Sequence, residues 1–149
     1  MVYNIKSAEQ TEALGRVLAD TLAKDGIKRA FIAMRGEMGV GKTVFCRGFA
    51  SVFGIKGVKS PTYTIVNEYR GEGGVRIYHF DLYRIDGSDD LESIGYDDYI
   101  KAEGYCIAEW SERVPEEIPE GAIFVSISRE AECEDWRKIE ITGYPCEVL

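Results

Sequence analysis

The sequence predicts an α/β layered domain built around a mixed β-sheet, and three observations support this. Short apolar runs typical of strands alternate with amphipathic segments typical of helices. A glycine-rich loop joins one apolar run directly to a helical segment. Two pairs of alternating segments predict antiparallel neighbours, so the sheet is not purely parallel. At 149 residues, the chain has the length of one ordinary domain, and we expect residues 1–149 to form it.

The first third of the chain is expected to hold a strand, a helix, a strand and a helix. The first strand is short, alternates in polarity and suits a sheet edge. Ser7 can cap the first helix, Gly26 ends it, and Gly54 ends the second helix. The second strand is apolar throughout, which indicates burial on both faces. The expected ranges are residues 2–5, 7–26, 29–34 and 42–53.

The rest of the chain begins with a predicted hairpin, in which residues 63–70 and 74–84 flank the turn GEGG. After it we expect one short helical segment, one buried strand, one loop and two late strands that pair with each other. These lie at residues 89–100, 104–110, 115–122, 122–129 and 136–142, and residues 143–149 have no assignment.

The most informative motif is G-x-x-x-x-G-K-T at residues 36–43. Its glycines allow successive backbone N–H groups to turn inward around phosphate oxygens. Lys42 would reach the β- and γ-phosphates, and the Thr43 hydroxyl would ligate Mg²⁺. An apolar strand before the loop and a helix after it are the required context. A dinucleotide loop of the G-x-G-x-x-G type does not fit this spacing. The motif predicts a nucleoside triphosphate site.

Two acidic residues at strand ends are candidates for the rest of that site. Glu109 ends the buried run YCIAE, where an acid of the Mg²⁺ shell is expected, although a surface acid would fit the same pattern. Strand alternation places His79, Asp81 and Tyr83 on one face, opposite Phe80. Asp81 could orient the attacking water and His79 could position a neighbour, whereas a hydrogen-bonded hairpin face is the structural alternative.

The stretch KSPTYT could act as a switch-like loop through Ser60 and Thr62, or could simply form a turn. The sequence has no D-x-x-G after the phosphate loop and no N-K-x-D, so adenine is favoured over guanine.

Composition narrows the function further. The net charge of −8 argues against a broad nucleic-acid surface, although Arg47, Lys56 and Lys59 could form a local basic patch. No apolar run is long enough for a membrane span, and the N-terminus does not resemble a signal peptide, so we expect a cytoplasmic protein. The sequence has one histidine, His79, and four scattered cysteines, which are Cys46, Cys106, Cys133 and Cys146. This composition argues against a zinc site and favours reduced thiols.

Four stretches in order, GEMGVGKTVFCRGF, VKSPTYTIVNEY, YHFDLYR and AEW, closely resemble the TsaE (formerly YjeE) family of small bacterial ATPases. The resemblance runs from about Ser7 to Glu109 and continues more weakly beyond. It implies a three-layer P-loop NTPase-like domain with a mixed sheet. It also implies slow ATP hydrolysis, with Mg²⁺, that serves threonylcarbamoyladenosine modification of tRNA. The implied partners are TsaB and TsaD, whose complex the ATP cycle would reset, and tRNA would be met only through that complex.

The resemblance also assigns roles to residues of this chain. It implies Mg²⁺ ligation by Thr43 and Glu109, and catalysis by Asp81 with Lys42. It places Thr11 near the nucleotide base. The implied ATP-binding set is Glu37, Met38, Gly39, Val40, Gly41, Lys42, Thr43, Thr11 and Arg137. From the residues themselves we expect a supporting set of His79, Tyr83, Arg84 and Trp110. No arginine occupies an obvious finger position, and Arg84 is the best candidate in cis. Ser111 replaces a proline that often follows E-W in the family.

Two other functions remain open from the residues alone. A small-molecule kinase would also pair a phosphate loop with an acid at a strand end, but 149 residues leave little room for a lid and an acceptor pocket. A nucleotide-dependent binding module would keep the loop and lack turnover.

Overall fold

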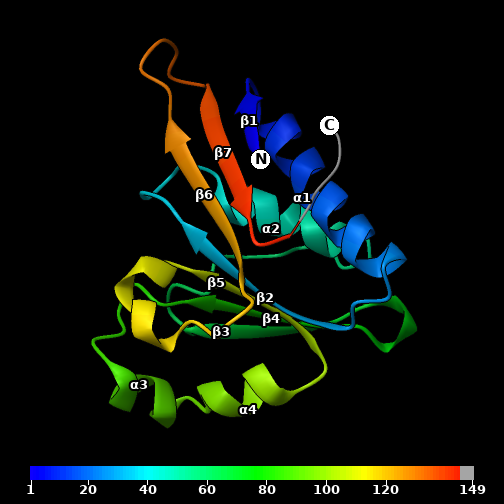
Figure 1. The fold of residues 1–149 in the computed structure, drawn as a ribbon, viewed down its shortest axis with the longest axis vertical. Helices are drawn as coiled ribbons and strands as arrows, with labels where there is room; N and C mark the ends of the chain where they lie inside the picture. The colour runs from blue at the N-terminus through cyan, green and yellow to red at the C-terminus, as the bar shows by residue number, and fades with distance from the viewer. Residues whose placement is uncertain (145–149) are drawn as a thin grey trace.

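The computed structural model of the protein describes residues 1–144, and within them seven strands form one mixed sheet (Figure 1). The order is β1-β7-β6-β2-β5-β4-β3, with β2, β4, β5 and β6 mutually parallel and β3, β7 and β1 antiparallel to their neighbours. The strands are β1 Val2–Ile5, β2 Arg29–Arg35, β3 Val66–Arg70, β4 Arg76–Asp81, β5 Gly104–Glu109, β6 Ile123–Arg129 and β7 Arg137–Thr142. The expected α/β class with a mixed sheet is confirmed.

Helices cover both faces of the sheet and make three layers (Figure 1). Helices α1 (Ala8–Lys24) and α2 (Lys42–Ser51) share one apolar core with the sheet, and α3 (Ser88–Ser93) and α4 (Tyr96–Lys101) share a second core on the opposite face. The alternation of each strand decides which core a residue enters, so Ile77 of β4 joins the first core and Phe80 joins the second.

Helix α1 follows the sequence expectation closely. The Ser7 hydroxyl accepts a hydrogen bond from Gln10 N at 3.2 Å, and Gly26 has a left-handed φ of 70° just beyond the helix. Gly15 of α1 and Gly48 of α2 allow the two backbones to approach closely, because a Cβ atom at either position would overlap the other helix. This close contact fixes the position of α2 relative to α1. It therefore also fixes the position of the loop that precedes α2.

The expected hairpin forms, but both of its strands are shorter than predicted. Strand β3 starts at Val66 instead of residue 63, because Ile65 N donates to Pro61 O at 2.8 Å and closes a turn. Strand β4 ends at Asp81, so Tyr83 lies outside the strand that was expected to carry it.

Other boundaries also differ. The single helical segment expected at residues 89–100 is two helices, because Gly95 takes a left-handed φ of 76° between α3 and α4. Helix α2 ends at Ser51, two residues early, and the expected loop at 115–122 includes a 3₁₀ turn at Pro115–Glu117. The late strands β6 and β7 pair in antiparallel register as predicted.

Two further points concern the chain as a whole. No helix within residues 1–144 combines the length and apolarity that a membrane crossing needs. Cys46, Cys106 and Cys133 are free thiols, and Cys146 lies outside the described residues.

Candidate functional site

The glycine-rich loop lies at the carboxyl end of a central parallel strand. Residues 36–41 connect the carboxyl end of β2 to α2, and β2 lies between β5 and β6 in the sheet. Ligands of open α/β sheets bind outside the carboxyl ends of the parallel strands. The first turn of α2 adds backbone N–H groups that have no partner within the helix, and these groups favour an anion.

The backbone of the loop depends on its glycines. Gly39 and Gly41 have left-handed φ values of 78° and 116°, which side-chain-bearing residues rarely adopt. Lys42 Nζ reaches back across the loop and donates to Gly36 O at 2.6 Å. The loop therefore curls around the ammonium group that is expected to meet phosphate.

Lys42 occupies an unusual environment for a charged residue. Its side chain is only 5% exposed, and its Nζ lies 3.7 Å from the centre of the Trp110 ring. Burial lowers the pKa of Lys42, and the nearby carboxylates of Glu109 and Glu112 oppose that change. Trp110 itself has a left-handed φ of 61°, a strained conformation for a bulky residue and one often found at functional sites.

The two predicted acids lie side by side. Strands β4 and β5 are parallel and pair Asp81 with Glu109 at their carboxyl ends, where both side chains are buried. The Thr43 hydroxyl donates to the Glu109 carboxylate, at 3.3 Å from Oε2. Asp81 Oδ1 accepts a hydrogen bond from Tyr83 N at 3.0 Å. A hydroxyl facing a carboxylate beside a phosphate loop is a set of hard oxygen ligands that suits Mg²⁺.

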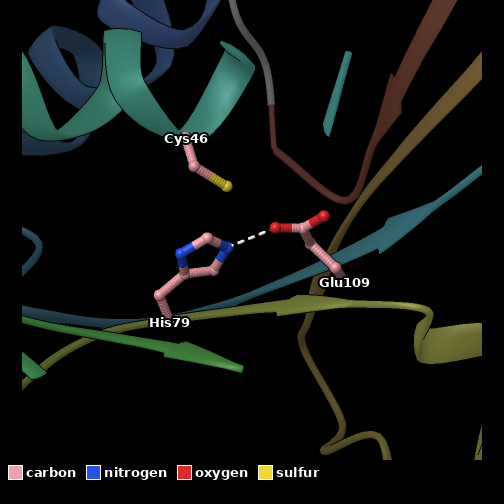
Figure 2. A group of neighbouring side chains, drawn as sticks. All are labelled: Cys46, His79 and Glu109. Carbon is pink, nitrogen blue, oxygen red and sulfur yellow. Dashed lines mark hydrogen bonds and ion pairs between the residues drawn. The ribbon is translucent and has the colours of Figure 1, made fainter. Parts of the chain in front are cut away.

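His79 and Cys46 lie next to Glu109 in the interior of the protein. The His79 Nε2 atom contacts Glu109 Oε2, while His79 Nδ1 is buried without a hydrogen-bond partner among the described residues. One ligand atom each from Cys46, His79 and Glu109 lie within 4.8 Å of one another (Figure 2). Burial, together with Glu109, raises the pKa of the Cys46 thiol well above its ordinary value. Sequence spacing gave no sign of this cluster.

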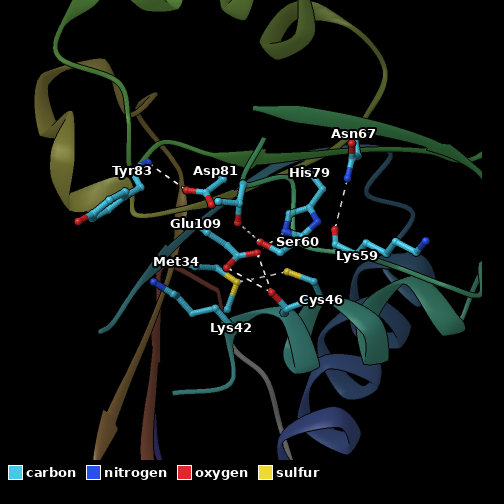
Figure 3. Close-up of polar contacts among 12 residues, drawn as sticks. Met34, Lys42, Cys46, Lys59, Ser60, Asn67, His79, Asp81, Tyr83 and Glu109 are labelled. Carbon is cyan, nitrogen blue, oxygen red and sulfur yellow. Dashed lines mark hydrogen bonds and ion pairs between the residues drawn. The ribbon is translucent and has the colours of Figure 1, made fainter. Parts of the chain in front are cut away.

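The switch-like loop lies against the acids (Figure 3). Ser60 Oγ and Thr62 Oγ1 are hydrogen-bonded to each other at 2.7 Å, and Ile65 O accepts from Asp81 N at 2.8 Å. Ile65 has a φ of 69°, which is rare for a β-branched residue. The end of this loop is thus tied by its backbone to one of the two acids.

A hollow of about 350 Å³ adjoins the other side of the phosphate loop. Thr11 and Arg137, both predicted from the sequence, line it together with Gly39 and Gly41. Arg137 Nε donates to Val40 O at 3.0 Å, so this side chain also holds the loop in place. The hollow is large enough to receive a flat aromatic base next to the phosphate position.

Some predicted residues lie at the margin of the site. Glu37 and Met38 are exposed at the tip of the loop. Tyr83 is 46% exposed and packs against Trp110, with ring centres 4.9 Å apart. The Arg84 guanidinium lies over the Tyr63 ring, 5.3 Å from its centre.

Sequence reasoning missed two residues that contact the loop. Arg129, at the end of β6, pairs with Glu37 at 3.1 Å and donates to Met38 O at 3.0 Å. Glu112 accepts a hydrogen bond from Gly36 N at 3.1 Å. Glu112 follows Glu109 by three residues and was a possible signal, whereas no local pattern marks Arg129.

The fold and this site together define an α/β protein of the P-loop class. The profile of the family described as "Threonylcarbamoyl adenosine biosynthesis protein TsaE" matches residues 5–139. The chain therefore belongs to the TsaE family.

Individual relatives agree with that assignment. The protein named tRNA threonylcarbamoyladenosine biosynthesis protein TsaE from Bacillus subtilis is 36% identical over 136 residues, which cover 91% of this chain and 80% of the relative. The protein of the same name from Haemophilus influenzae is 40% identical over 129 residues, covering 85% and 79%. A crystal structure of Bacillus subtilis YdiB superposes with a TM-score of 0.74 at 27% identity, covering 93% of this chain and 82% of that one.

Proposed function

We propose that this protein is a Mg²⁺-dependent ATPase that serves N6-threonylcarbamoyladenosine (t6A37) modification of tRNA in the cytoplasm. Its ATP cycle would reset the complex of TsaB and TsaD, in which TsaD carries out the transfer to tRNA. The pathway is supported by membership of the TsaE family and by the names of the relatives. The ATPase chemistry is supported above all by one observation, the Thr43 hydroxyl 3.3 Å from a buried Glu109 carboxylate beside the phosphate loop.

The proposed roles follow from where each side chain lies. Thr43 and Glu109 would hold Mg²⁺, which when bound would neutralise charge on the β- and γ-phosphates. Lys42 would exchange its bond to Gly36 O for phosphate oxygens. Asp81 Oδ1 accepts a hydrogen bond from Tyr83 N, and Oδ2, which has no hydrogen bond within residues 1–144, would orient the attacking water.

The adenine would occupy the hollow between the loop and the start of α1. Thr11 and Arg137 line that hollow, and Arg137 anchors Val40 at its wall. The P-loop backbone, from Glu37 to Thr43, would enclose the phosphates. Ser60 and Thr62, joined to Asp81 through the backbone of Ile65, would report the state of the γ-phosphate to the surface.

The rate of the isolated protein is expected to be low. Arg129 and Arg137 are bound to carbonyl groups of the loop, and Arg84 is stacked on Tyr63. An arginine finger is worth about 10³ to 10⁵ in rate, so a site that lacks one until a partner binds is slow alone. We therefore expect hydrolysis to rise when TsaB and TsaD are both added.

The test measures ADP and inorganic phosphate together, with and without both partners. Equal amounts of ADP and phosphate that rise with the partners would support the ATPase. Lys42→Ala and Asp81→Ala should abolish the rise, whereas Asp86→Ala should keep it, because Asp86 is an acid whose side chain is 89% exposed. ADP without free phosphate, in the presence of small alcohols, would indicate a kinase instead. Partner binding without any turnover would indicate a binding module.

A further inference from the structure

The cluster behind the proposed magnesium position offers softer ligands than magnesium prefers. Cys46 comes from α2, His79 from β4 and Glu109 from the end of β5 (Figure 2). Their side chains are 2%, 1% and 4% exposed, and one ligand atom from each lies within 4.8 Å of the others. Three segments far apart in the sequence therefore bring together a sulfur, an imidazole nitrogen and a carboxylate oxygen.

This set of atoms selects a different metal from Mg²⁺. Magnesium takes oxygen ligands, whereas thiolate and imidazole favour zinc and other thiophilic cations. Zinc lies about 2.0–2.3 Å from such atoms, so a tetrahedral site needs ligands roughly 3.5 Å apart. Atoms as far apart as 4.8 Å would have to close by roughly 1 Å, and the contacting His79 Nε2 and Glu109 Oε2 atoms would have to separate, both through side-chain rotations.

The His79 ring is held by few hydrogen bonds, so it can rotate toward a cation. Its Nδ1 atom has no hydrogen-bond partner within residues 1–144, although the ring is almost wholly buried. Buried polar atoms nearly always have partners, and an unpaired one raises the free energy of the folded state. The imidazole is thus held by one hydrogen bond, to Glu109, and the nitrogen that makes it, Nε2, is the one that would meet a cation, while Nδ1 lies on the far edge of the ring (Figure 2).

We propose that Cys46, His79 and Glu109 form a binding site for a thiophilic divalent cation such as Zn²⁺, which inhibits the protein by withdrawing Glu109 from Thr43. On binding, the Cys46 Sγ–H bond breaks, its proton goes to solvent and the sulfur bonds to the cation. The Glu109 carboxylate, now 3.3 Å from the Thr43 hydroxyl, turns toward the cation. The binding half of the proposal stands alone, and the inhibitory half rests on the proposed ATPase function.

Binding is tested with Co²⁺ as the probe, added to the full nucleotide-free chain. Thiolate bound to Co²⁺ gives a near-ultraviolet charge-transfer band, and a tetrahedral site gives strong visible bands. We expect both in the wild type, with Zn²⁺ bleaching them. Cys46→Ser and Cys46→Ala should each lose the charge-transfer band while circular dichroism shows a folded chain, and Cys133→Ser should retain it. An absent band in the wild type, or an unchanged band in both Cys46 variants, would overturn the site.

Inhibition is tested by titrating Zn²⁺ into the ATPase assay at a fixed excess of Mg²⁺. Loss of a supporting hydrogen bond alone weakens metal binding ~10–100-fold, so loss of a ligand in Cys46→Ser should raise the half-inhibitory zinc concentration at least about 10-fold. Without zinc, Cys46→Ser should hydrolyse ATP like the wild type. Equal zinc sensitivity of both proteins would refute the inhibitory half. If neither hydrolyses ATP, the proposed function fails, while the Co²⁺ spectrum still decides the metal site.

Discussion

The crossing of α1 and α2 offers a sharp test of how the fold supports the phosphate loop. In Gly48→Ala, the added Cβ would lie 2.7 Å from the carbonyl carbon of Glu12 and 3.0 Å from its Cα. These are backbone atoms, so the two helices must separate. Overpacking costs ~1–3 kcal/mol, and the upper part of that range, about 2–3 kcal/mol, applies here because backbone atoms cannot rotate away, whereas alanine gains only about 1 kcal/mol over glycine in a helix. We expect a net loss of about 1–2 kcal/mol in the free energy of unfolding.

The measurement is urea denaturation together with a thermal melt. For a chain of this size, about 1 kcal/mol lowers Tm by about 2–4 °C, so the melt should fall by about 2–8 °C. ATP affinity should fall as well, because α2 carries Lys42 and Thr43 at its N-terminus. Gly87→Ala is the matched control, since its Cβ would meet nothing within 4 Å and its φ of 179° suits any residue. A Gly48→Ala protein as stable as the wild type would refute the close-packing argument.

Three further predictions concern single contacts. Arg137→Ala should raise the Kd for ATP, measured by calorimetry, about 10-fold or more, because a charged hydrogen bond to the loop is worth about 1.5–3 kcal/mol. Arg129→Ala should raise the Kd only several-fold, because the ion pair of Arg129 is more exposed. A larger effect of Arg129→Ala than of Arg137→Ala would contradict this reasoning. Ser111→Ala should lower the free energy of unfolding by about 1–3 kcal/mol, because the buried Ser111 hydroxyl donates to a β2 carbonyl at 3.0 Å, and an unchanged urea midpoint would count against it. Burial raises the pKa of the Cys106 thiol from 9.0 to about 12, so its contribution to stability is intact below pH 9.0 and falls as pH rises toward 12. In urea titrations at alkaline pH, the free energy of unfolding of Cys106→Ala should therefore fall less steeply with pH than that of the wild type. The same dependence on pH in both proteins would contradict the assignment.

The phosphate loop could be predicted because its information is local. Eight consecutive residues, an apolar strand before them and a helix after them already determine the backbone that phosphate needs. The same holds for the Ser7 cap and for the pairing of the late strands. Asp81 and Glu109 were found individually as strand ends, but their adjacency depends on the parallel pairing of β4 with β5.

The rest depends on contacts between distant segments. Ile65 is a good strand residue by composition, yet its amide donates to Pro61 O and closes a turn, so β3 begins only at Val66. Arg129 forms an ion pair with Glu37, 92 positions away in the sequence, and no local periodicity predicts such a pair. Cys46 looked like an ordinary buried thiol of a helix, and only the layering of α2 over β4 brings it to His79.

The proposed metal sites therefore depend on the register of β4 against β5 as much as on the phosphate-loop motif. Side chains alternate along a strand, so a slip of β4 by one residue against β5 would turn Asp81 away from α2 and put Phe80 in its place. The apolar residues below the acids prevent that slip, because Ile77 and Phe80 belong to cores on opposite faces. Thr43 lies in the first turn of α2, so the close contact of α2 with α1 then sets the distance between the Thr43 hydroxyl and the Glu109 carboxylate. Packing far from the nucleotide thus decides whether Glu109 faces Thr43, and a disturbance there should change metal preference before it unfolds the protein.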